Sequence, residues 1–454
     1  MNVEPANTLL AEGEAQKLLK SVLGRCPERA EAIYLEADEA LTRFANNHVH
    51  QNVRSRRRSV VLRLFLGKRA GVASTSRLDA QALDDLVERA RAMAELSPEN
   101  PDFGDLPPPA AVQRLAGYVD ATAECSPDER AEAVRRVIDP VKKAGMVVAG
   151  ALSTGSNLVA VANTAGVFAY FPSTASNFTC TVMADDSSGW VDVHARDWRQ
   201  LDTGALGHKA IEKARVSARP VAMPAGKYTV VLEENAVAEL VAFLGWTGFG
   251  AQSYQEGHSF LNGRLGQKIT GERITIVDDA FDARTLGMPF DYEGVPKRRV
   301  PLIEGGVAKG LVHDTISAKR DGVASTGHAL PPPNPEGPLP YDLVVGTGEH
   351  TVDEMIAATE NGILVTRFWY NRVVDPRNTV ITGMTRDGTF RIENGKVVGG
   401  VRNLRYNESV LDVLARAERI GKTALPTVFD YTRNCVVAPA MQVRDFNFTG
   451  VTEF

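Results

Sequence analysis

Apolar residues recur at spacings of three and four residues in several stretches of the chain, which places them on one face of an α-helix. The clearest stretch follows Asp79, an Asx-type N-cap, and continues through Leu83, Leu86, Val87 and Ala90. Pro140 is expected to end another such stretch. The same periodicity predicts helices over residues 8–24, 79–93, 128–138, 237–244, 352–359 and 410–420.

Between these stretches the chain consists mostly of short apolar runs separated by Gly, Asn, Asp and Ser, a pattern typical of antiparallel strands. The dipeptides Asp387-Gly388 and Asn394-Gly395 predict tight hairpin turns. The runs predict strands over residues 32–37, 60–65, 72–74, 147–152, 158–163, 167–171, 178–185, 189–194, 228–232, 273–277, 300–303, 379–384, 389–393, 396–398 and 441–448.

This order of elements predicts an α+β fold in three parts. Residues 1–110 form a mixed α/β domain, residues 111–222 open with helices and continue as a strand-rich meander, and residues 223–454 form a β-rich domain. Proline-rich stretches at 97–110 and 331–340 are expected to be connectors, and the second is alternatively a preformed wall of a peptide groove.

Composition narrows the class of protein. The chain has 454 residues, 44% hydrophobic and 24% charged, as in an ordinary globular protein. A formal net charge of −5 gives no general attraction to nucleic acid or to an anionic membrane, and the arginines at 54, 56, 57 and 58 are too local to change that.

Cellular location is expected to be cytoplasmic. The first residues resemble no signal peptide, and no apolar run approaches the ~20 residues that span a bilayer. The four cysteines include no CxxC pair, which fits a reducing compartment and argues against a disulfide scaffold.

Several short motifs stand out along the chain, at residues 71–75, 276–279, 290–296, 302–307, 360–363 and 390–397. In their order and spacing they resemble the TldD/PmbA family of peptidase subunits. The resemblance covers almost the whole chain and implies the fold type of that family, with a metalloprotease-like C-terminal domain.

The resemblance also implies a division of labour between two kinds of subunit. The TldD member carries a His-Glu-x-x-x-His motif that binds zinc, whereas the TldE/PmbA member lacks it and pairs with TldD. Together they degrade small or unfolded peptides. A chain of either type is expected to form dimers, with a TldD-type partner or with itself.

In this chain the equivalent of the zinc motif falls at Ala242-Phe243-Leu244-Gly245-Trp246-Thr247, on the helix expected after Glu234. Ala242 and Thr247 stand at the ligand positions and Phe243 at the position of the general base. A zinc peptidase needs imidazole or anionic ligands and a proton acceptor, and these side chains supply neither. The window therefore indicates an apolar packing face, and no zinc is expected in this chain.

A rival placement at Ser253-Tyr254-Gln255-Glu256-Gly257-His258 keeps one histidine, but serine is a poor zinc ligand and tyrosine a poor base. If this chain binds metal at all, the candidates are His258, Glu256 and Cys435. The alternative interpretation is an exposed histidine and a small buried thiol.

Other candidates carry less chemistry. His328, before the second proline-rich stretch, is a candidate substrate-binding residue in a channel, with a solvated loop as the alternative. His48 and His50 are expected to be an exposed pair on one side of a strand. Residues 346–350 lack the lysine of a phosphate-binding loop, and Thr351 with Glu354 instead predicts a helix cap.

The sequence therefore predicts an accessory, zinc-free TldE/PmbA-type subunit of a cytoplasmic peptidase, with zinc in its TldD-type partner. Two alternatives remain: a self-sufficient metallopeptidase with a divergent zinc site, and a peptide-binding homodimer without protease activity.

Overall fold

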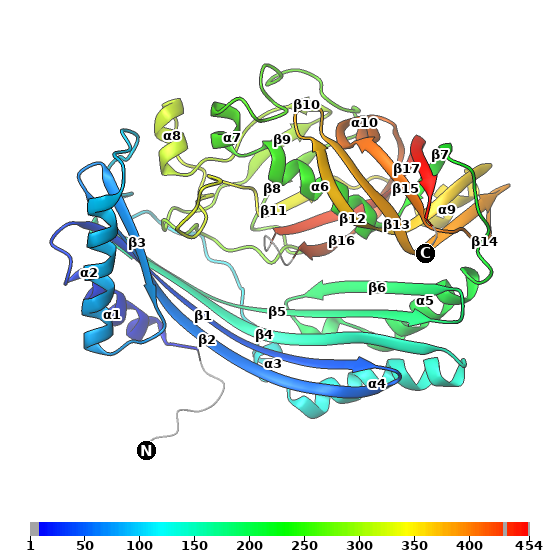
Figure 1. The fold of residues 1–454 in the computed structure, drawn as a ribbon, viewed down its shortest axis with the longest axis horizontal. Helices are drawn as coiled ribbons and strands as arrows, with labels where there is room; N and C mark the ends of the chain where they lie inside the picture. The colour runs from blue at the N-terminus through cyan, green and yellow to red at the C-terminus, as the bar shows by residue number, and fades with distance from the viewer. Residues whose placement is uncertain (1–8, 430–433, 453–454) are drawn as a thin grey trace.

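The computed structural model describes residues 9–429 and 434–452 and confirms the α+β class. Its described strands form two sheets, one of six strands and one of eleven. The six-stranded sheet curves beneath the C-terminal part of the chain, as Figure 1 shows.

The six-stranded sheet has the order β3-β2-β1-β4-β5-β6, with antiparallel neighbours throughout. β1 pairs with β4 along most of its length, with Asp38 opposite Ser156. The boundary expected near residue 110, between the first two domains, therefore lies between strands that belong to a single sheet. The strands are β1 (Arg29–Ala45), β2 (His48–Leu66), β3 (Arg69–Thr75), β4 (Val147–Asn163), β5 (Phe168–Met183) and β6 (Ser188–Ala195).

Successive side chains on these strands point to opposite faces of the sheet, and other parts of the chain pack against both faces. One face packs against four helices: α1 (Glu12–Leu23), α2 (Ala80–Leu96), α4 (Pro127–Lys143) and α5 (Thr203–Val216). On the other face, Ile33, Val161 and Phe171 pack against Phe290 of the C-terminal segment. In Figure 1, α4 and α5 accordingly lie on the opposite side of the sheet from the C-terminal segment.

The element order repeats within this region. Each half of the sheet consists of a helix, three strands and a helix, first α1-β1-β2-β3-α2 and then α4-β4-β5-β6-α5, with the small α3 (Asp120–Ala123) and a 3₁₀ turn (Trp198–Gln200) added. In both halves the last helix touches the edge strand at a glycine. A Cβ on Gly71 would lie 2.0 Å from the Ala90 oxygen, and one on Gly189 would lie 2.1 Å from the Ala210 oxygen.

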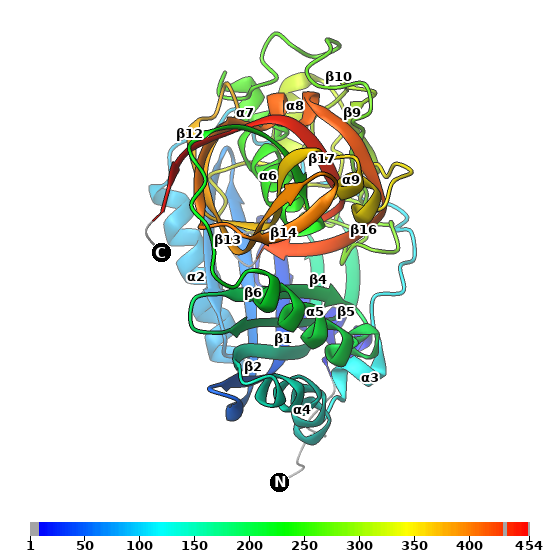
Figure 2. The ribbon, with the colours of Figure 1, turned by 90° about the vertical axis from the view of Figure 1, so that its right-hand side faces the viewer.

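The eleven-stranded sheet contains a closed ring, in which β7, β12, β13, β15 and β17 pair in turn and β17 pairs again with β7. Figure 2 shows these strands curling round. The strands are β7 (Gly226–Leu232), β8 (Ile276–Asp278), β9 (Val300–Glu304), β10 (Val307–Ala308), β11 (Asp342–Val345), β12 (Asn361–Asp375), β13 (Val380–Glu393), β14 (Lys396–Gly400), β15 (Leu404–Ser409), β16 (Ala417–Phe429) and β17 (Asn434–Val451).

Helix α6 (Glu234–Gly248) packs against β17 and β12 with Val237, Leu240, Val241 and Leu244 in the core, as its periodicity predicted. The remaining described helices of this segment are shorter: α7 (Ala251–Gln255), α8 (Thr315–Asp321), α9 (Val352–Ala357) and α10 (Val410–Ala415).

Several sequence predictions of local structure are wrong. Pro140 lies inside α4, which continues to Lys143, because a proline removes one helical hydrogen bond without preventing the tertiary packing of Val137 and Val141. Asp387-Gly388 is not a hairpin turn but lies within the continuous strand β13, where both residues have positive φ. The helix expected over 410–420 ends at Ala415, since β16 begins at Ala417.

Other local predictions are confirmed. Asn394-Gly395 joins β13 to β14, and Glu393 pairs directly with Lys396. Thr351 and Glu354 form a capping box at the start of α9. Two long strands, β4 and β5, each replace a pair of short strands that the sequence predicted on either side of a polar stretch. The polar residues between the predicted strands also pair in the antiparallel ladder.

Candidate functional site

Residues 242–247, the window expected at the position of the zinc motif, lie in the second half of α6. Ala242, Phe243 and Thr247 are each partly buried, and Trp246 is 48% exposed. The Thr247 hydroxyl donates to the Phe243 carbonyl oxygen at 2.6 Å, so it serves its own helix. The Phe243 and Trp246 rings lie with their centroids 6.2 Å apart. An alanine methyl, a phenyl ring and a threonine hydroxyl used within the helix do not fit a zinc ion.

The opposite face of this window is closely packed, as expected for an apolar face. A Cβ on Gly245 would lie 2.9 Å from a Leu343 methyl and 3.5 Å from the ring of Pro340, at the end of the second proline-rich stretch. A Cβ on Gly248 would lie 2.3 Å from the Phe260 ring. The window is therefore held between the core and the proline-rich stretch, with only the Trp246 side presented to solvent.

One carboxyl group beside the window was missed by the sequence interpretation. Glu239 precedes Phe243 by one helical turn, and its Oε2 accepts hydrogen bonds from the Phe368 amide at 3.1 Å and from Asn371 Nδ2 at 2.9 Å. Burial raises the pKa of Glu239 to about 8, although the charge of Arg367 opposes this. The signal was present in the sequence, because Glu239 is the one charged residue of α6 after Glu234.

A second polar group faces α6 from the six-stranded sheet. His194 Nε2 lies 2.9 Å from Asp192 Oδ2, and Asn177 Nδ2 donates to Asp192 Oδ1 at 2.9 Å. Although burial opposes it, the hydrogen bond and charge of His194 lower the pKa of Asp192. Asn235, in the first turn of α6, donates to the Asp192 carbonyl oxygen at 3.4 Å. We call Asn177, Asp192, His194, Asn235 and Glu239 the α6 seam.

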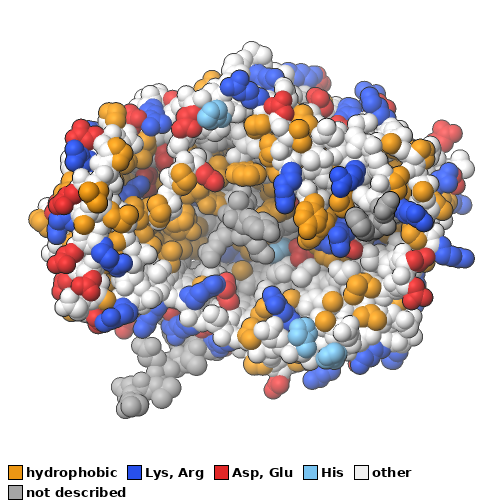
Figure 3. Space-filling view, viewed as in Figure 1, with side chains coloured by type: hydrophobic (Ala, Val, Ile, Leu, Met, Phe, Trp, Pro, Cys, Tyr) orange, Lys and Arg blue, Asp and Glu red, His pale blue; other side chains and the backbone are white. Residues whose placement is uncertain are grey.

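Aromatic and cationic side chains lie next to the α6 seam. The Arg367 guanidinium lies 4.2 Å from the centroid of the Trp190 ring and 4.9 Å from that of Trp369, and it also pairs with Asp387. Trp369 and Tyr370 are 38% and 60% exposed. Figure 3 shows a hollow near the middle of one face of the molecule with hydrophobic side chains around its rim. Such surfaces suit the binding of apolar side chains of a ligand.

The alternative metal candidates are not brought together. His258 Nδ1 lies 3.6 Å from Glu256 Oε2, and both side chains are largely exposed. Cys435 is buried in β17, and burial, followed by the charge of Asp342, raises the pKa of its thiol to about 12. Within residues 9–429 and 434–452, no group of three His, Cys, Asp or Glu side chains is arranged to hold a metal ion. The rival window fits zinc no better, because Ser253 and Tyr254 add no imidazole or anion to this pair.

His328 is fully buried in the C-terminal core. Its Nε2 lies 2.8 Å from Asp278 Oδ1 and its Nδ1 lies 2.9 Å from Thr326 Oγ1. Lys297 lies 3.9 Å from Asp278 and 3.4 Å from Asp342, so two carboxylates balance the lysine in this cluster. The solvated loop expected as the alternative at His328 is not observed, because this residue is buried. A substrate-binding role for His328 stays a prediction, and it requires the ring to become accessible.

The two remaining sequence candidates show no functional geometry. His48 and His50 lie exposed on β2 with their ring centroids 6.5 Å apart. Residues 346–350 form the connection that leads to the cap of α9. In the described part of the chain, no helix is both long enough and apolar enough to cross a membrane.

Comparison with known families agrees with this arrangement of segments. Sequence models of the PmbA/TldA metallopeptidase domain 1, central domain and C-terminal domain match residues 30–94, 101–218 and 225–450. The chain therefore belongs to the PmbA/TldD family.

Individual relatives are similar over part or most of the chain. The metalloprotease PmbA of Escherichia coli O157:H7 is 23% identical over 394 residues, 83% of each chain. A TldD homologue of Haemophilus influenzae is 26% identical over 215 residues, 47% of this chain, and an uncharacterised Methanocaldococcus jannaschii protein is 33% identical over 130 residues, 28% of this chain. These two alignments span 44% and 31% of those relatives.

The fold is also that of a solved relative. TldE from Thermococcus kodakarensis superposes with a TM-score of 0.87 over 96% of this chain and 99% of its own, at 22% sequence identity. At this identity the likeness concerns the fold.

Proposed function

We propose that this chain is the accessory, zinc-free subunit of a TldE/PmbA type that acts with a TldD-type catalytic partner to degrade small or unfolded peptides. The observation that carries the proposal is the α6 window. Ala242, Phe243 and Thr247 stand where zinc ligands and a general base are needed, and the Thr247 hydroxyl is engaged within its helix. The zinc and its activated water then belong to the partner.

The role of this chain in the assembly is to bind and orient the peptide. The exposed Trp246, Trp369 and Tyr370 offer apolar contacts, and the edge strands of the two sheets offer main-chain hydrogen bonds. The four cysteines are all unpaired, which supports residence in the reducing cytoplasm.

The decisive experiment separates the accessory subunit from a self-sufficient metallopeptidase. The purified chain is analysed for zinc and assayed for peptide cleavage with and without a chelator, alone and after mixing with the TldD-type protein of the same organism. We expect substoichiometric zinc and no cleavage by the chain alone, and chelator-sensitive cleavage by the mixture. Stoichiometric zinc with chelator-sensitive cleavage by the lone chain contradicts the proposal.

A variant tests the remaining metal candidate. His258→Ala should leave partner-dependent cleavage within about twofold of the wild type, because its side chain is 69% exposed and meets Glu256 at the surface. Alanine substitution of the motif histidines in the partner, as the matched control, should abolish cleavage. Loss of activity in His258→Ala with normal assembly would instead favour a divergent site in this chain.

The peptide-binding homodimer is distinguished by its partners. A tagged chain expressed at its native level should recover the TldD-type protein, and size-exclusion chromatography should show the pair eluting together. Recovery of copies of this chain alone would favour the homodimer.

A further inference from the structure

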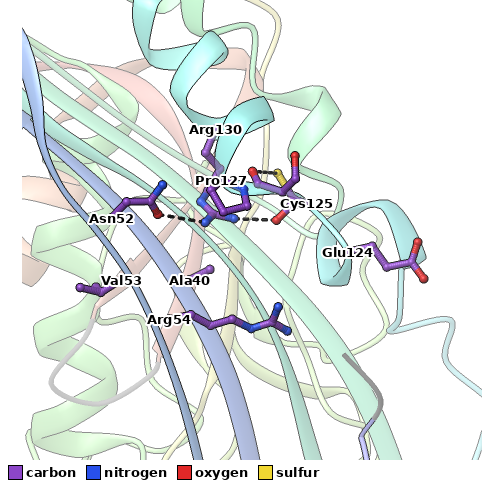
Figure 4. A pocket seen from close by; sticks show the side chains of 9 residues that line it. Ala40, Asn52, Val53, Arg54, Glu124, Cys125, Pro127 and Arg130 are labelled. Atoms are coloured by element: carbon purple, nitrogen blue, oxygen red, sulfur yellow. Dashed lines mark hydrogen bonds between the residues drawn. The ribbon is translucent and has the colours of Figure 1, made fainter. Parts of the chain in front are cut away.

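A cavity of about 430 Å³ lies on the helix-covered face of the six-stranded sheet, apart from the α6 seam. Residues at the start of α4 form one wall, and Ala40 of β1 with Asn52 and Arg54 of β2 forms the other (Figure 4). This volume is within the range of small-molecule binding sites.

The wall of this cavity contains a buried arginine whose hydrogen-bond partners among the described residues are neutral. Arg130 is 2% exposed, and its Nη1 donates to the Cys125 carbonyl oxygen at 2.6 Å and to Thr154 Oγ1 at 3.4 Å. Its Nε donates to Thr42 Oγ1 at 3.2 Å and its Nη2 to Asn52 Oδ1 at 3.2 Å. A guanidinium has five N–H donors, so one on Nη2 remains for a ligand.

No carboxylate among the described residues forms an ion pair with Arg130, whose hydrogen-bond acceptors there are all neutral oxygens. The nearby Glu129 carboxylate accepts hydrogen bonds from Ser126 in the capping box of α4. Glu124 is exposed, and its carboxylate points away from Arg130 in Figure 4. A buried cation without a counter-ion is costly in free energy, and a bound anion would offset that cost.

The surroundings favour an anion further. Arg54 also lines the cavity, and its bonds to Asp38, at 2.7 and 2.8 Å, leave its Nη1 donors available. The N-terminus of α4, a helix of 17 residues, contributes the positive end of its dipole beside Ser126 and Pro127.

We propose that this cavity binds a small molecule bearing a carboxylate or phosphate group, with its oxyanion on Arg130 and the remainder of the molecule along Asn52 and Arg54. Arginine suits this ligand class because its planar donors match both oxyanions. The site is independent of the peptidase role proposed for the chain.

Thermal unfolding of the full chain tests the site, with inorganic phosphate, succinate or sodium chloride added at equal ionic strength. One of the two oxyanions should raise Tm by about 2 °C over chloride when present at roughly ten times its Kd. The oxyanion that gives the larger rise identifies the phosphate or the carboxylate as the preferred group, and isothermal titration calorimetry gives its affinity.

Asn52→Asp supplies the missing carboxylate within the protein, 3.2 Å from Arg130 Nη2, with almost no change in shape. It should raise Tm in chloride and abolish the additional rise caused by the oxyanion. Asn407→Asp, at an exposed strand position, is the matched control and should keep that rise. The proposal is overturned if neither oxyanion raises the Tm of the wild type above chloride, or if Asn52→Asp retains the full rise.

Discussion

The two halves of the six-stranded sheet share their order of elements but differ in what their inner faces carry. The first half presents Ile33 and Val61, which pack against Phe290 together with Phe171 of the adjoining strand β5. The second half presents Asp192 and His194 to α6 instead. The same order of elements thus serves two purposes. In one half it contributes apolar contacts to the C-terminal segment, and in the other it places titratable groups beside the zinc-motif window.

The helix-covered faces of the halves differ in charge balance. Beneath the start of α1, the buried Glu36 accepts hydrogen bonds from the Leu10 amide at 3.0 Å, from Tyr34 at 2.9 Å and from Arg56 at 2.7 Å. Beneath the start of α4, the described partners of Arg130 are all neutral. A charge that is fully compensated indicates a structural role, whereas an uncompensated one indicates a place for a ligand.

The largest effect should come from the glycines that the two halves share. Gly71→Ala and Gly189→Ala should each lower the free energy of unfolding by about 3 kcal/mol, because each new Cβ meets a helix carbonyl oxygen near 2 Å and the helix must move. Urea unfolding measures both. Gly13→Ala, where a Cβ meets nothing within 4 Å, is the control and should be neutral or stabilising. A loss in only one of the pair would show that the halves are not packed equivalently.

A smaller effect should follow from removing the compensated charge of the first half. Glu36→Gln should cost about 2 kcal/mol, because its carboxylate accepts charge-assisted bonds in a buried position. Glu39→Gln, which breaks the exposed pair with Arg57, is the matched control and should cost under about 1 kcal/mol. Equal stabilities of the two variants in urea unfolding would contradict the importance of the Glu36 site.

An effect on stability that is absent at pH 5 and grows as the pH rises should come from Glu239, which faces the second half. Its pKa is raised to about 8, so between roughly pH 4.5 and 8 the unfolded chain loses this proton and the folded chain keeps it. Stability contributed by the protonated group is therefore lost as pH rises through this range. Glu239→Gln retains an oxygen for the Phe368 amide and should flatten that decline by about 1 kcal/mol per pH unit.

Thermal unfolding from pH 5 to pH 9 measures this difference. The variant and the wild type should agree at pH 5, and the variant should be more stable at pH 8. The exposed Glu88→Gln on α2 serves as the control and should follow the wild type throughout. An unchanged slope in Glu239→Gln would mean that this carboxyl group ionises normally in the folded protein.

Local periodicity predicted the elements of the fold better than their connections. The amphipathic helix after Asp79 was predicted because its buried positions follow one face, and Asp79 indeed accepts a bond from the Ala82 amide. The pairing of β1 with β4 was not predicted, because it joins residues more than a hundred positions apart and depends on tertiary contacts. The repeat of the two halves was missed for the same reason, although Gly71 and Gly189 mark it.

The sequence located the candidate site through the missing zinc ligands and did not identify the polar residues that surround it. Residue types alone showed that Ala242 and Phe243 are poor zinc-site residues, and the structure adds the bond that engages Thr247. Asp192 and His194 were not identified, since alternate residues of one strand acquire meaning only when a second segment covers them. The burial of His328 was likewise invisible, because its partner Asp278 lies on a distant strand.

Strand β17 has a consequence for how the protein is made. It pairs with β7, β11, β15 and β16, so the sheet that holds α6 depends on residues translated long after β7. The last described strand of the six-stranded sheet ends at Ala195, so that sheet can assemble while translation continues. The C-terminal ring must wait for β17, and until then β7 has an open edge that invites incorrect pairing.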